Sequence, residues 1–123
     1  MITITKDDLI YQDKGIYPAY FITCCVKDGS NKDKLGFPDF GGYRTFGFYY
    51  NLEEARAALN ENRCDMHECL YDYAAIEKLY PKIHPLCLDA EDIEWYKFDT
   101  DRKGFFLDQK NINKAGPCNF ALG

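Results

Sequence analysis

The fold of this chain is decided by Gly42–Leu59, which reads GYRTFGFYYNLEEARAAL. Phe46, Phe48 and Tyr50 stand at every second position, and this period of two predicts a strand with one buried face. Asn51 then offers a side-chain oxygen to the first turn of a helix, and Glu54 stands three positions on, as in a capping box. We therefore expect the strand to stop at Asn51 and a helix to cover 52–62.

The expected helix is amphipathic. Its apolar stripe is narrow, and the opposite face carries charged and amide side chains. A stripe of this width is typical of a helix that lies on a sheet and leaves its other side in water. The stripe consists of Leu52, Ala55, Leu59 and Ala58.

Other segments rich in β-branched and aromatic residues predict further strands. They are 16–26, 70–77, 93–99 and 105–107. Residues 75–79 also fit a helix, which leaves an alternative for the third strand. The last two strands flank a turn at 100–104 and form a β-hairpin. The order of elements predicts an α+β domain, in which a mostly antiparallel sheet of about five strands carries one main helix on one face.

Two stretches are less regular. Residues 27–42 consist of turn formers, and we expect a long loop or flap that folds over something through Leu35, Phe37 and Phe40. Residues 1–16 mix Ile-Thr alternation with charges, so we expect a short edge strand followed by a loop or a turn of helix. The 123 residues fit a single domain.

The composition excludes several classes of partner. A net charge of −5 opposes a protein that reads DNA or long RNA, because such binding depends on a basic patch. With no apolar export signal and no long apolar run, we expect a cytoplasmic protein that does not contact membranes. Its six cysteines are then expected as thiols, with adjacent Cys24 and Cys25 on opposite faces of one strand. Ten Tyr and nine Phe predict that some rings lie on the surface and serve recognition.

The densest group of reactive side chains is 63–69, RCDMHEC. Its Cys64 and His67 can be drawn with His84 and Cys87 as a zinc site. A helix-to-strand connection, in which His67 bonds a backbone carbonyl or a carboxylate, fits the spacing better. No flanking sequence supports a thiol enzyme, and the carboxylate pairs fit helix starts or solvated positions. We expect no enzyme, no metal and no cofactor.

Arginines close to tyrosines suggest a binding site. Arg44 on the expected strand and Arg63 beyond the expected helix offer planar donors for an anion. Tyr73 supplies a ring for stacking, and His67 supplies a further donor near neutral pH. We expect these four side chains to line a pocket for a small anionic, nucleotide-like ligand. The alternative is that the arginines are solvated and paired with Glu53 and Asn60.

Five segments together resemble a family of small uncharacterised proteins from bacterial mobile elements and phages. They are 44–48, 62–68, 71–77, 95–98 and 119–123, and the resemblance extends over residues 43–123. Its context implies a cytoplasmic protein of a bacterial host that counters host defences, either by capturing a nucleotide signal or by masking a defence protein.

These observations predict a non-catalytic binding protein that captures a small anionic, nucleotide-like ligand, as an anti-defence sponge for a cyclic nucleotide signal. A homo-oligomer is expected because sheet edges and aromatic side chains are available for self-association. The alternative is a protein-binding inhibitor that acts on a host defence enzyme through its acidic surface.

Overall fold

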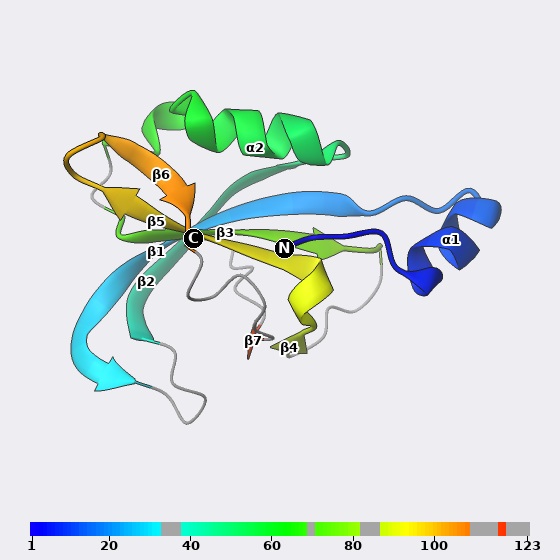
Figure 1. The fold of residues 1–123 in the computed structure, drawn as a ribbon, viewed down its shortest axis with the longest axis horizontal. Coiled ribbons are helices and arrows are strands. Elements are labelled where there is room, and N and C mark those ends of the chain that lie inside the picture. Colours follow the sequence, from blue (N-terminus) through cyan, green and yellow to red (C-terminus); the bar gives the residue numbers. More distant parts are fainter. Residues whose placement is uncertain (33–37, 69–70, 82–86, 109–115, 118–123) are drawn as a thin grey trace.

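A five-stranded antiparallel sheet forms the centre of the molecule (Figure 1). The structure, a computed structural model, describes residues 1–32, 38–68, 71–81, 87–108 and 116–117. The strands are β1 Ala19–Lys32, β2 Pro38–Tyr49, β3 Tyr73–Leu79, β5 Ile93–Asp99 and β6 Gly104–Leu107, in the spatial order β2-β1-β3-β5-β6. The predicted α+β class and the predicted C-terminal hairpin of β5 and β6 are confirmed. The helical alternative for 75–79 is wrong, because β3 continues to Leu79.

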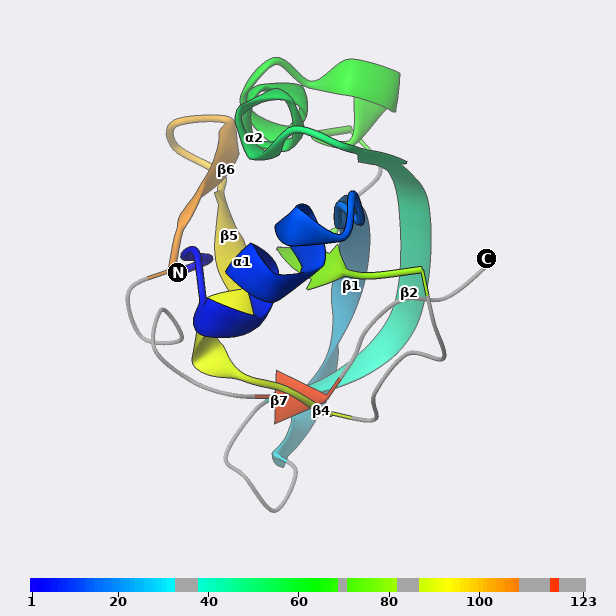
Figure 2. The ribbon, with the colours of Figure 1, turned by 90° about the vertical axis from the view of Figure 1, so that its right-hand side faces the viewer.

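The α-helices of the described residues, α1 and α2, occupy different parts of the sheet. Helix α2, Leu52–Asn60, lies over one face, whereas α1, Lys6–Asp13, lies at the end of the sheet where β1 begins (Figures 1 and 2). Opposite α2, a small antiparallel pair is formed by β4, Cys87–Leu88, and β7, Gly116–Pro117. Short 3-10 turns cover Arg63–Asp65 and Ala90–Asp92. In the described part of the chain, no helix is long and apolar enough to cross a bilayer.

Helix α2 begins where the sequence predicts. The side-chain oxygen of Asn51 accepts a hydrogen bond from the backbone N–H of Glu54 at 3.1 Å, which satisfies one of the free donors of the first turn. The helix ends at Asn60, two residues before the predicted end. Its buried residues belong to the predicted stripe and are Ala55, Ala58 and Leu59.

Alternating strand residues build one apolar cluster on each face of the sheet. Cys24 and Ile76 pack under α2, and Cys25 and Trp95 pack on the opposite face. The prediction that the two adjacent cysteines point to opposite faces is therefore confirmed. Because both faces are covered, β3 is buried along its whole length.

The prediction of a loop at 27–42 is wrong for most of its residues. Strand β1 continues to Lys32 and β2 begins at Pro38, so turn-forming residues are part of a long strand pair. The register shifts on both sides of Lys27, and such irregularities let a strand pair accommodate glycines and turn formers by interrupting the ladder locally. Residues 33–37, which include Leu35 and Phe37, lie outside the described residues.

The prediction of an edge strand within 1–16 is also wrong, since the regular element there is helix α1. A complete capping box starts this helix. The N–H of Asp8 donates to Thr5 Oγ1 at 3.3 Å, and the N–H of Thr5 donates to Asp8 Oδ2 at 2.8 Å. The Thr-x-x-Asp spacing is the local sequence signal for this helix start, and the adjacent carboxylates of Asp7 and Asp8 fit the interpretation of carboxylate pairs as helix starts.

Candidate functional site

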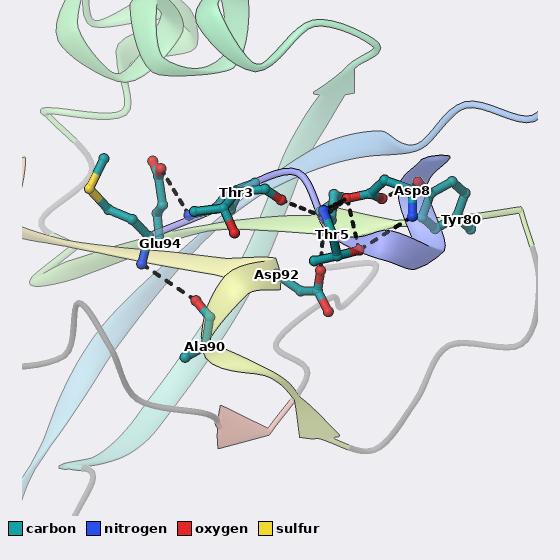
Figure 3. Close-up of polar contacts among 10 residues, drawn as sticks. Thr3, Thr5, Asp8, Tyr80, Ala90, Asp92 and Glu94 are labelled. Carbon is teal, nitrogen blue, oxygen red and sulfur yellow. Dashed lines mark hydrogen bonds and ion pairs between the residues drawn. The ribbon is translucent and has the colours of Figure 1, made fainter. Parts of the chain in front are cut away.

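Helix α1 is attached to the sheet by a buried carboxylate. Among the residues of α1, all of them described, Asp8 alone is buried. Its side chain accepts hydrogen bonds from Lys78 Nζ at 2.6 Å and from the hydroxyl of Tyr80. Lys78 lies in β3 and Tyr80 follows that strand directly, so these contacts join the N-terminal helix to the end of the central strand (Figure 3).

The segment before α1 is held in the same region by backbone contacts. The N–H of Thr3 donates to the carbonyl oxygen of Glu91 at 3.0 Å, and the N–H of Ile2 donates to Glu94 Oε1 at 3.2 Å. Lys78 Nζ donates to the carbonyl oxygen of Thr3 at 3.0 Å. The first residues of the chain therefore lie along the start of β5, where Figure 3 shows Thr3 close to Glu94.

The charged groups of this region keep their ordinary charge states at neutral pH. Burial raises the pKa of Asp8, but the hydrogen bonds from Lys78, Tyr80 and Thr5 outweigh burial and hold that pKa below its usual value. Burial lowers the pKa of Lys78, yet the carboxylates of Asp8 and Asp92 hold it above its usual value. The pKa of Tyr80 is raised by burial and by its bond to Asp8. None of these pKa shifts moves a group closer to neutral pH, where it could donate or accept a proton in a reaction. We therefore interpret the cluster as the attachment of α1 to the sheet.

A cavity of about 600 Å³ lies beside this attachment. One wall is the connection between α1 and β1, and the other walls come from the ends of β1, β2 and β3. Because β1 and β2 are antiparallel with Phe21 opposite Phe48, the beginning of one strand and the end of the other supply neighbouring rings. The aromatic lining residues are Tyr17, Phe21, Phe48, Tyr50 and Tyr80.

A second cavity of about 240 Å³ adjoins the first. It shares Tyr17, Tyr50 and Tyr80 with the larger cavity and adds Asp8 and Gln12, so it is the more polar of the two. We call the two cavities together the aromatic cleft. Among the described residues, no Lys, Arg or His lines either of them.

Three rings of the aromatic cleft are accessible to solvent. Tyr17 is 59% exposed, Phe48 is 49% exposed and Tyr50 is 72% exposed. The composition predicted rings on the surface, and this prediction is confirmed. Grouped exposed apolar side chains mark surfaces that bind ligands or partners. The aromatic cleft is therefore the candidate functional site.

The predicted site residues Arg44 and Arg63 lie outside the aromatic cleft. The guanidinium of Arg44 lies 4.7 Å from the ring centroid of Phe46 on β2. Arg63 donates hydrogen bonds to the hydroxyl of Tyr49 and to Glu61 Oε2, both at 2.9 Å. These hydrogen bonds to Tyr49 and Glu61 raise the pKa of Arg63. Arg63 is therefore an exposed, paired arginine, as in the alternative interpretation, but its acidic partner is Glu61, whereas Glu53 pairs with Arg56.

His67 and Tyr73 lie on different faces of the sheet. His67 Nε2 bonds to the carbonyl oxygen of Leu59, and its ring contacts Phe105 edge to face in the cluster under α2. Tyr73 is buried in the opposite cluster, and burial raises the pKa of its hydroxyl. The structure therefore does not bring the four predicted residues to one pocket. The expectation that His67 bonds a backbone carbonyl is confirmed.

No local pattern in the sequence indicates that the residues of the aromatic cleft lie together. Tyr17, Phe48 and Tyr80 are far apart along the chain and meet through the pairing of β1 with its neighbours. The bond between Asp8 and Lys78 spans 70 positions. A capped helix ahead of the first strand was the one local pattern that could have drawn attention to this end of the molecule.

A metal site finds no support in the described part of the chain, where no three His, Cys, Asp or Glu side chains are grouped to hold an ion. His84, which the zinc arrangement drawn from the sequence would need, lies outside the described residues, as does the side chain of Cys87. Comparison with protein-family models, curated proteins and solved structures finds no match to this chain. The resemblance to mobile-element and phage proteins therefore stays a prediction from sequence segments alone.

Proposed function

We propose that this protein is a non-catalytic binding protein whose binding site is the aromatic cleft. The observation that carries the proposal is a cavity of about 600 Å³ with a largely aromatic lining, a size and character typical of small-molecule sites. The exposed rings of Tyr17 and Tyr50 at this site would lose contact with water when a ligand enters.

The absence of catalysis is argued from the charges at the cleft. Asp8 is ionised and Lys78 is protonated, and each is held in that state by the other. A general acid or base needs a pKa close to the working pH. The hydrogen bonds of Asp8 to Thr5, Lys78 and Tyr80 also occupy both of its oxygens.

The ligand favoured by this geometry has an apolar body. The cleft has no basic residue among those described, so it offers nothing to neutralise a phosphate. An anionic, nucleotide-like ligand would have to bind near Arg44 and Arg63 instead, and it stays a prediction from the sequence. The anti-defence role implied by the resemblance stays a prediction for the same reason.

The proposal is tested with N-phenyl-1-naphthylamine, an uncharged probe whose fluorescence rises in apolar surroundings. The purified full chain should raise this fluorescence, and Phe48→Ser should abolish most of the increase because the central ring of the cleft is lost. Tyr43→Ser is the matched control, since Tyr43 is an exposed ring of the same strand that lines neither cavity. Equal fluorescence with Phe48→Ser and the parent would contradict the proposal.

A second candidate function is docking of a protein partner, including another copy of the chain, over the same end of the molecule. The observation that favours it is the outward position of Ile4, Leu9 and Ile10, which are 76%, 55% and 53% exposed next to the cleft. Exposed large apolar side chains that lie near one another often mark interfaces. Light scattering on the parent and on Leu9→Lys tests self-association. A parent that is monomeric across the accessible concentrations excludes the homo-oligomer.

A further inference from the structure

The rings of the aromatic cleft are set at different angles. Phe21 and Phe48 have centroids 5.1 Å apart with planes inclined by 37°, and Phe48 and Tyr50 have centroids 5.6 Å apart with planes inclined by 82°. The face of an aromatic ring carries partial negative charge and its edge carries partial positive charge. A cavity lined by rings that are inclined to one another can surround a cation from more than one side, as aromatic cages do.

The charges around the cleft also favour a cation. Asp8 is the one charged residue among the described residues that line it. Behind it, Lys78 is shared between the carboxylates of Asp8 and Asp92, so the group as a whole is negative. The hydroxyl of Tyr80 donates to Asp8, and this bond shifts electron density toward a ring that lines both cavities. The net charge of −5 over the whole chain acts in the same direction.

From these observations we propose that the aromatic cleft binds a small organic cation that carries a trimethylammonium group. This inference rests on the proposed binding function and names its ligand class. A trimethylammonium group has no N–H donors, so it can lose its water against aromatic walls without leaving hydrogen bonds unmade. A primary ammonium would need acceptors, and both oxygens of Asp8 already accept bonds from Thr5, Lys78 and Tyr80.

The test compares choline with 3,3-dimethylbutan-1-ol, which has the same shape with carbon in place of the charged nitrogen. Both are titrated into the full chain, and binding is followed by amide chemical shifts in two-dimensional NMR. Choline should bind about tenfold more tightly than the alcohol, as expected for a cation–π contribution of about 1.4 kcal/mol. The shifted amides should belong to the aromatic cleft.

A variant of the cleft separates the π contribution from apolar contact. Tyr50→Leu keeps an apolar side chain but removes the ring, so choline should bind about fivefold more weakly while the alcohol is hardly affected. Tyr43→Leu is the control and should change neither affinity, because Tyr43 lines neither cavity. Tyr17→Leu repeats the test from the other wall if Tyr50→Leu proves unstable. Tyr17 and Tyr50 are both mostly exposed, so either variant should fold.

The outcomes distinguish this inference from the function on which it rests. If the alcohol binds as tightly as choline, the cation inference is overturned and the apolar binding site stands. If N-phenyl-1-naphthylamine, choline and the alcohol all fail to bind, the proposed function is overturned as well. Choline binding that Tyr50→Leu and Tyr17→Leu both leave unchanged would place the cation elsewhere and would also overturn the inference.

Discussion

Helices α1 and α2 are attached to the sheet by opposite means. Helix α2 buries an apolar stripe that includes Leu59, whereas the single buried residue of α1 is the carboxylate of Asp8. The apolar residues Leu9 and Ile10 of α1 face solvent instead. Apolar packing has no strict direction, but a buried carboxylate needs each of its partners in place.

Helix α2 has an ionic contact in addition to its apolar one. The guanidinium of Arg56 donates to the buried carboxylate of Glu94, with 3.1 Å between Nε and Oε2, and the hydroxyl of Tyr96 donates to the same oxygen at 2.8 Å. Without this pair α2 still has its apolar contacts. Without the Asp8 pair α1 keeps the stacking of Tyr11 on Tyr80, with ring centroids 4.3 Å apart, but no buried apolar stripe. Helix α1 and its connection to β1 supply a wall of the aromatic cleft. The comparison shows that the aromatic cleft depends on α1, the helix that is attached to the sheet without a buried apolar stripe.

The largest loss of stability is expected when the apolar attachment of α2 to the sheet is weakened. Leu59→Ala removes a side chain that is 1% exposed, and it should lower the free energy of unfolding by about 3 kcal/mol. The loss should be global, since Leu59 belongs to the main cluster of the core. Chemical denaturation followed by circular dichroism measures it. A loss well under 1 kcal/mol would mean that α2 is not held by its apolar stripe.

A smaller and more local loss of stability is expected when the polar attachment of α1 through Asp8 is weakened. Asp8→Asn keeps the shape of the side chain but weakens its bond to Lys78, at a cost of about 2 kcal/mol, as for hydrogen bonds to charged groups. Hydrogen exchange should accelerate in α1 and leave α2 protected. Asp7→Asn is the matched control, because Asp7 is exposed in the same helical turn. Equal acceleration in both helices would show that α1 is not a separate unit.

The contribution of the Asp8 carboxylate to the free energy of unfolding should disappear in acid. The pKa of Asp8 is below its usual value in the folded protein, so its ionised form stabilises folding above a pH of about 4, and this stabilisation is lost as the pH falls further. Asp8→Asn has no carboxylate to titrate. The difference in stability between parent and variant should therefore narrow between about pH 5 and pH 2. An unchanged difference across this range, measured by urea denaturation, would assign the effect of the variant to packing.

The smallest effect is expected at the start of α2. Asn51→Ala removes the acceptor for the N–H of Glu54 and should cost about 1 kcal/mol. Asn51→Asp restores an acceptor and should recover most of the loss. Coinciding denaturation midpoints of Asn51→Ala and the parent would contradict the capping role.

Local patterns in the sequence determined most of the architecture. The alternation before Asn51, the cap at Asn51 and the hairpin turn at 100–104 each depend on neighbours within a few positions, so their physical cause is visible in the sequence. The course of 27–42 was predicted wrongly because its turn formers are held as strand by pairing with the neighbouring strand, which lies outside any local window.

The composition also determined that aromatic rings would be exposed, but only the tertiary structure decided which rings meet. Phe21 and Phe48 become neighbours through strand register, and Tyr17 joins them because Asp8 fixes α1 to a lysine 70 positions away. The predicted set with Tyr73 and His67 failed to meet because side chains on the two faces of a sheet are separated by the sheet itself. Residue chemistry can be read from the sequence, whereas convergence on a site depends on long-range pairing that has no local signal.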